Sequence, residues 1–225
     1  MKNNYLSLFL VAGLLFASSV NATVLISPSS LNHGSMGTFS SLHLSEFAIN
    51  GSGISPSNPF TENSVVLATT QDTHNTWLAK EKTGVIYFNF DTTVTLSSFL
   101  LWNYHDPDNG PHHHTGIGVN EFSLEFFSGV DGTGTLQSST SPLFATAAIP
   151  QENVEAQAFN FNSVSGVQSV AMTINSNHGS SFAPGFHEVG FSENHISEIP
   201  EPSTMYLSIL SVALLTISRR KKRLL

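Results

Sequence analysis

The stretch Val85-Ile86-Tyr87-Phe88-Asn89-Phe90 consists almost entirely of β-branched and aromatic residues, the types that favour strands. A second apolar run, Val94 to Tyr104, follows after three polar residues and is long enough to contain a bulge. No amphipathic helix of useful length appears in the central part of the chain. The two runs therefore predict neighbouring strands and indicate an all-β domain.

Comparable runs recur along the chain. Strict alternation of apolar and polar residues predicts strands at 121–127 and 170–174, and shorter runs predict strands near 23–26, 47–49, 156–161 and 186–191. Clusters of Gly, Pro, Asn and Ser separate these runs, as expected for turns and loops. About eight strands joined by irregular loops indicate a β-sandwich of the jelly-roll kind.

The N-terminal residues have the order of a secretory signal peptide. Lys2 precedes an apolar run at 5–16, and small and polar residues follow as far as Ala22. We predict cleavage by signal peptidase after Ala22, which makes 1–22 the signal peptide and 23–197 the exported domain. An uncleaved membrane anchor is the alternative, but the apolar run is short for a membrane span.

Residues 198–225 contain three parts in a fixed order. A Pro-Glu-Pro box is followed by an apolar segment at 205–217, predicted to be a short transmembrane helix, and then by a basic run that resists translocation. The box consists of Pro200, Glu201 and Pro202, and the basic run of Arg219, Arg220, Lys221, Lys222 and Arg223.

This three-part tail resembles the PEP-CTERM sorting signal of Gram-negative bacteria. The resemblance implies that an exosortase, a membrane cysteine protease, recognises the box and cuts the protein from a transient membrane anchor. It implies a substrate of that protease, located at the cell surface or in the extracellular matrix. An ordinary tail anchor is the alternative.

Charge and composition exclude several functions for the domain. Between Thr23 and Ile199 there are two lysines, no arginine and fifteen carboxylates, a formal charge of −13. Such a surface repels phosphate backbones, which argues against nucleic acid as a partner, and favours cations. The absence of cysteine excludes thiol nucleophiles, zinc-thiolate sites and disulfides.

Sequence motifs for catalysis are also missing. The chain has no Gly-x-Ser-x-Gly elbow, no phosphate-binding loop and no dinucleotide fingerprint, so we expect a protein that is not an enzyme. A hydrolase with paired carboxylates stays open, because the distance between two such groups depends on the fold.

Several segments together resemble the discoidin, or coagulation factor type C, branch of the galactose-binding-like sandwiches. They are Thr76-Trp77 and residues 84–90, 100–104, 118–124 and 185–191. In that family a Trp opens the sheet and a Glu-Val pair closes the domain. The match spans about Phe47 to Glu193 and implies a non-catalytic carbohydrate-binding module, here associated with exopolysaccharide. A structural envelope or biofilm protein without a specific ligand is the alternative.

The same resemblance implies a structural calcium ion. Carried over residue by residue, the family's metal position falls on Asn50 with Gly51, on Thr76 and on Glu188. Oxygen ligands of these types suit calcium. A Glu188 that is simply exposed or hydrogen-bonded at the end of a strand is the alternative.

The loop after Asn103 is rich in histidine, with four imidazoles and two carboxylates between positions 104 and 114. We predict that Trp102, Tyr104, His105 and His112 contact a sugar by stacking or hydrogen bonding. A divalent metal could also bind the histidines and aspartates of this loop. A solvated polar loop is the alternative to both.

Overall fold

The computed structural model describes residues 25–57, 61–67, 75–104, 115–149 and 152–196. The signal peptide, Ala22, the Pro-Glu-Pro box, the apolar segment 205–217, the basic run 219–223, His105 and His112 lie outside these residues. Within the described residues the chain is all-β, with three short 3-10 turns: η1 (Ser45–Ala48), η3 (Thr115–Ile117) and η4 (Val130–Gly132). No helix in this described part is long and apolar enough to cross a membrane.

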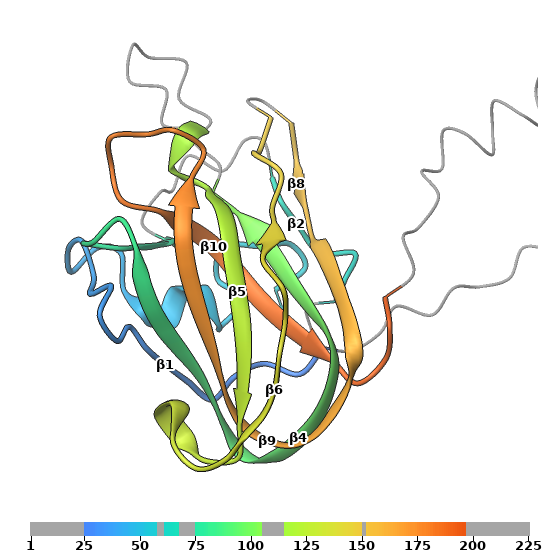
Figure 1. Ribbon diagram of the computed structural model, residues 1–225. Helices are drawn as coiled ribbons and strands as arrows, with labels where there is room; N and C mark the ends of the chain where they lie inside the picture. The colour runs from blue at the N-terminus through green and yellow to red at the C-terminus, as the bar shows by residue number, and fades with distance from the viewer. Residues whose placement is uncertain (1–24, 58–60, 68–74, 105–114, 150–151, 197–225) are drawn as a thin grey trace, which may run out of the picture. The chain divides into compact units, whose positions relative to one another are not determined.

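Two long antiparallel strands form the centre of the domain: β4 (Gly84–Asn103) and β9 (Gln157–Asn177). The register between them is regular over Gly84–Asn89 and again from Ser98, and shifts three times in between. Extra residues at such bulges bend a strand. The β4·β9 ribbon therefore folds over at the lower end of the domain in Figure 1.

Because the ribbon bends, its two halves belong to two layers. The first half of β4 and the second half of β9 lie in one layer with β1 (Ser30–Asn32), β5 (Val119–Phe127), β6 (Leu136–Ser139) and β7 (Leu143–Phe144). In the other layer the second half of β4 pairs on one side with the first half of β9 and on the other with β10 (Gly185–Ser192), and β10 pairs in turn with the edge strand β3 (Trp77–Leu78). A separate ribbon joins β2 (Val65–Val66) to β8 (Val154–Glu155).

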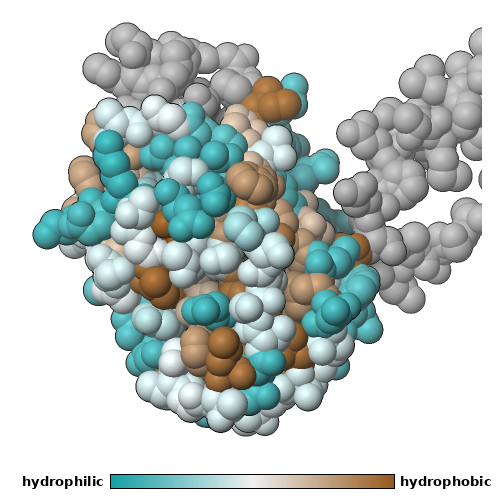
Figure 2. All heavy atoms as spheres, viewed as in Figure 1, coloured by the Kyte–Doolittle hydropathy of each residue, from teal (hydrophilic) through white to brown (hydrophobic). Residues whose placement is uncertain are grey.

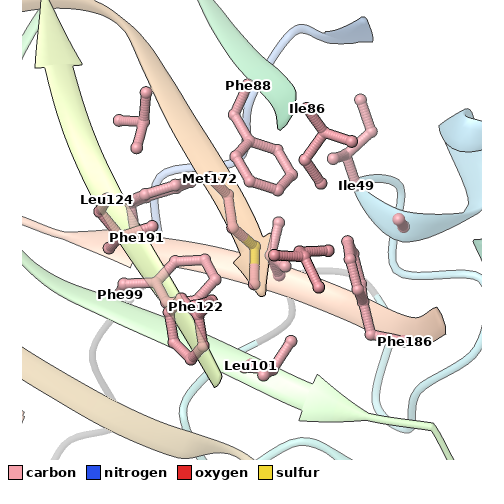
Figure 3. Packing of buried hydrophobic residues seen from close by; sticks show 14 of the residues in the cluster. Ile49, Ile86, Phe88, Phe99, Leu101, Phe122, Leu124, Met172, Phe186 and Phe191 are labelled. Carbon is pink, nitrogen blue, oxygen red and sulfur yellow. The ribbon is translucent and has the colours of Figure 1, made fainter. Parts of the chain in front are cut away.

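The core between the layers is dominated by phenylalanine. The ring of Phe88 in the first layer meets that of Phe191 in the second edge-on at 5.7 Å, and the ring of Phe122 meets those of Phe99 at 5.6 Å and Phe159 at 5.1 Å. Figure 3 shows Phe88, Phe99, Phe122 and Phe191 converging from both layers. Each such pair is worth about 0.5–1.5 kcal/mol beyond the apolar area it buries. The prediction of an all-β sandwich is confirmed.

Several details differ from the sequence predictions. The runs at 85–90 and 94–104 are one continuous strand, as are those at 156–161 and 170–174. The strand predicted near 47–49 is wrong, because this segment forms η1. Near 23–26 there is only an isolated bridge from Ile26 to Phe191, and the regular strand begins at Ser30. The jelly-roll connectivity stays a prediction.

Candidate functional site

The predicted ligand site falls at the end of the sandwich where β4 ends and β10 begins, the upper end in Figure 1. Phe186, near the start of β10, pairs with Asn103, the last residue of β4. Tyr104, just after β4, and Thr115, the first residue of η3, are the described residues on either side of the histidine-rich segment 105–114. The segment itself lies outside the described residues.

Asn103 forms a hydrogen-bonded clamp between Tyr104, just before the histidine-rich segment, and Val119, shortly after it. Its side chain is fully buried, and its Nδ2 donates to the carbonyl oxygens of Val119 at 2.8 Å and Thr146 at 2.9 Å. Its Oδ1 accepts from the backbone N–H groups of Val119 at 2.8 Å and Tyr104 at 3.0 Å. The amide thus pairs with Val119 as a strand backbone would, and its bonds to Val119 and Tyr104 satisfy buried polar groups.

Gly118 completes this clamp because it allows the close approach. A Cβ at position 118 would lie 2.8 Å from Oδ1 of Asn103. Sequence reasoning did not identify either residue. The available signal was an amide at the end of the apolar run 99–102, a position where a polar side chain must find internal partners.

Glu188 is the buried carboxylate of this end. It is fully buried in β10, and its Oε2 accepts from the backbone N–H of Gly51 at 2.5 Å while its Oε1 accepts from that of Val189 at 3.3 Å. Burial raises the pKa of Glu188 to about 9, and the hydrogen bonds from Gly51 and Val189 offset the shift only in part. The structure therefore brings together two of the positions predicted for calcium.

The other two predicted metal positions differ in their surroundings. Asn50 is exposed, and its Oδ1 accepts from the N–H of Ser52 at 2.9 Å. Thr76 is fully buried, and its Oγ1 lies 3.4 Å from Nδ1 of His43. The oxygens of Glu188 and Thr76 suit the chemistry of calcium, whereas the Asn50 side chain is already used in its own turn.

Metal ligands of other types do not converge in this part of the molecule. Among the residues that the structure describes, no group of three or more His, Asp or Glu side chains is arranged to hold a metal ion. Any calcium ion at Glu188 would therefore depend largely on backbone carbonyl and hydroxyl oxygens, which are common calcium ligands.

The two aromatic residues predicted to contact a sugar are covered. Trp102 is fully buried and donates from Nε1 to the carbonyl oxygen of Ser64 at 2.6 Å. Tyr104 is 2% exposed and stacks on the ring of His187 at a centroid distance of 5.9 Å. This corrects the expectation that these rings face a ligand. Trp102 lies on the face of β4 opposite to the core residue Leu101 and is covered there by the segment that contains Ser64, and His187 stacks on Tyr104.

Comparison with known proteins gives only distant similarities. No protein-family model matches this chain, and no curated protein matches it. Among solved structures, the family 32 carbohydrate-binding module of EndoD from Streptococcus pneumoniae is 11% identical with a TM-score of 0.47, and the alignment covers 76% of this chain and 99% of that one.

Two further solved structures are similar at the same level. Chitosan-binding module 1 of a chitosanase/glucanase from Paenibacillus sp. IK-5 is 12% identical, with a TM-score of 0.45 and coverage of 76% of this chain and 98% of that one. A fucose-binding module from Streptococcus pneumoniae is 8% identical, with a TM-score of 0.44 and coverage of 77% and 98%. These similarities are too distant to assign a ligand to this chain.

Proposed function

We propose that this chain is an exported, non-catalytic protein whose sandwich binds extracellular polysaccharide at the end formed by Asn103, Glu188 and the segment 105–114. The observation that carries the proposal is the Asn103 clamp. A buried amide that joins Tyr104 to Val119 fixes both ends of a polar, histidine-rich segment on a rigid sheet. Binding segments held by a rigid scaffold lose less entropy when a ligand is bound.

Calcium is part of this proposal. An ion at Glu188 would neutralise a carboxylate that makes no ion pair with any described residue, and would hold the 50–53 turn against β10 through the link between Gly51 and Glu188. The role is structural. It positions the same end of the sandwich from which the segment 105–114 extends.

Glycan binding is tested with the full chain and the polysaccharide of its own host. We expect retention in affinity gels, weakened about tenfold when His105 and His112 are both replaced by Ala, since two lost hydrogen bonds are worth about 1–3 kcal/mol together and 1.4 kcal/mol corresponds to a factor of ten. The matched control is His33→Ala, an exposed histidine in another segment. Equal retention of the double variant would remove this segment from the binding site.

A structural envelope protein without a specific ligand remains the second candidate. The acidic, cation-attracting composition of residues 23–199 favours it. Self-association that requires calcium but is indifferent to every polysaccharide tested would support this candidate over the first.

Sorting is the second half of the proposal. We expect the mature protein from its native host to begin after Ala22 and to end near Pro200-Glu201-Pro202, because the basic run at 219–223 holds the tail inside until exosortase cuts. Replacing Pro200 and Pro202 by Ala should let the apolar helix extend backwards and should trap the uncut form in the membrane. Mass spectrometry of the protein in the extracellular fraction identifies both termini. A C terminus still at Leu225 in that fraction contradicts the proposal.

A further inference from the structure

The outer face of the first layer has an unusual composition for a solvated sheet. Inward residues of β5 and β9 belong to the core, so the alternate residues point outward. Strand pairing places these outward residues in three rows. They are Tyr87, Ala171, Glu125 and Ser139 in the first row, Val85, Thr173 and Ser123 in the second, and Asn175, Glu121 and Phe144 in the third.

The third row combines an aromatic ring, a carboxylate and an amide. Phe144 is 65% exposed, the most exposed large apolar side chain among the described residues. It lies directly opposite Glu121, and Nδ2 of Asn175 donates to Oε1 of Glu121 at 3.4 Å from the next strand. Directly opposed residues of an antiparallel pair share one face, so the ring and the carboxylate are neighbours.

The first row ends in a second aromatic side chain that is held in place from both sides. A Cβ at Gly34 would lie 3.1 Å from the Tyr87 ring, and one at Gly132 would lie 2.6 Å from it. The Gly132 turn is fixed by Asn89, which exchanges two 2.8 Å hydrogen bonds with Asp131. Tyr87 therefore forms a rigid wall at one end of the face.

The middle of this face has short side chains of weak polarity. Ser123 and Thr173 pair across β5 and β9, and Ala171 between Tyr87 and Glu125 adds only a methyl group that is itself buried (2% exposed). Figure 2, which views this side of the domain, shows mostly pale atoms here with small teal and brown clusters among them. Two aromatic side chains thus flank a shallow floor along which an extended polymer chain could lie.

The charged groups of this floor all have one sign. Glu121 and Glu125 are four residues apart on the same side of β5, a separation of about 13 Å for an extended strand. Lys80 and Lys82, the only basic residues of the domain, precede β4 and are absent from all three rows. Such a face repels uronic acids and sulfated sugars and attracts protonated amines.

We propose that this outer face is a second glycan-binding surface, selective for a polysaccharide of amino sugars with free, protonated amino groups. The amines pair with Glu121 and Glu125, and the apolar side of a sugar ring packs on Phe144, which also attracts a nearby cation through its π face. Each exposed ion pair contributes at most about 1 kcal/mol. Binding therefore requires several sugar units at once and weakens with salt.

The test is calorimetric titration of the full chain with a fully deacetylated glucosamine oligosaccharide and with its N-acetylated counterpart, at a pH where the amines are protonated. We expect the deacetylated oligosaccharide to bind at least tenfold more tightly and to lose most of its affinity at high ionic strength. Replacing Glu121 and Glu125 together by Gln should weaken this binding tenfold or more, and Phe144→Ala severalfold. Equal affinity for both oligosaccharides, or no binding of either, overturns the proposal.

Matched variants separate this surface from the end of the sandwich. Glu193→Gln changes an exposed carboxylate and Phe39→Ala an exposed ring (58%) elsewhere on the domain, and both should leave the affinity unchanged. The double change of His105 and His112 to Ala should also leave it unchanged, even where it abolishes binding of the host polysaccharide. Amine-dependent binding lost in the histidine variant and kept in the glutamine variant would overturn this assignment. Thermal melts of each variant verify folding.

Discussion

Replacing Glu188 by Gln is expected to remove a large part of the pH dependence of stability. The pKa of Glu188 is raised from 4.5 to about 9 by burial, so between these values the folded state holds a proton that the unfolded state has released. The stabilisation from this group is complete below pH 4.5 and is lost as pH rises towards 9, at about 1.4 kcal/mol per pH unit. With chelator present, the free energy of unfolding of the variant should therefore exceed that of the parent by roughly 4 kcal/mol at pH 8 and should match it near pH 5.

Denaturant unfolding at a series of pH values measures this difference. The control is Glu193→Gln, which changes an exposed carboxylate just beyond the end of β10. Its free energy of unfolding should depend on pH as that of the parent does. Parallel pH profiles for the parent and Glu188→Gln would show that the carboxylate gains its charge inside the fold without cost.

Adding calcium to the same unfolding experiment tests the proposed metal site. An ion that binds the ionised carboxylate must displace the proton, so added calcium should stabilise the parent more at pH 8 than at pH 5. Saturation to a hundred times the dissociation constant adds about 2.7 kcal/mol. The Gln variant should show no such gain. An unfolding midpoint of the parent that is indifferent to calcium and chelator at pH 8 would remove Asn50, Thr76 and Glu188 from the proposed metal site.

Replacing Asn103 by Leu is expected to give the largest loss of stability of any polar substitution at this end of the sandwich. The change removes four hydrogen bonds and leaves three buried groups without this partner: the N–H groups of Tyr104 and Val119 and the carbonyl of Val119. The carbonyl of Thr146, an exposed residue, still accepts from Nε2 of Gln157. Each buried unsatisfied group costs about 1–3 kcal/mol. We expect a total of roughly 4 kcal/mol or more in urea unfolding.

Asn162→Leu is the matched control, because this exposed asparagine of β9 makes the same chemical change at the surface and should cost less than about 0.5 kcal/mol. Asn103→Asp adds a second comparison: it keeps the acceptors, loses the donors and buries a charge, so it should be at least as damaging as Leu. A loss below about 1 kcal/mol for Asn103→Leu would show that the segment 104–118 does not depend on this clamp.

The sequence alone was sufficient for the fold class and for the positions of the main strands. Apolar alternation in 121–127 survives folding because Phe122, Leu124 and Phe126 reach the core, and Trp77 lies in the edge strand β3 of the sheet. The predicted limits of the domain, 23–197, rest on local composition at the two ends of the chain and stay a prediction.

Long-range packing determined several structural features that the local sequence pattern could not predict. The bend that joins two predicted strands into β4 depends on register with β9, more than sixty residues away, and the segment 45–48 takes a 3-10 turn despite its apolar residues. The pairing of Glu188 with Gly51 was accessible only through a family resemblance, since 137 residues separate them. The exposure of Trp102 and Tyr104 was predicted wrongly, because an aromatic residue in a strand has the same sequence signal whether it faces solvent or a covering loop. An amide at the end of the apolar run 99–102 was a local signal for Asn103, but its partners, like the alignment of Phe144 with Glu121, exist only once separate strands lie side by side.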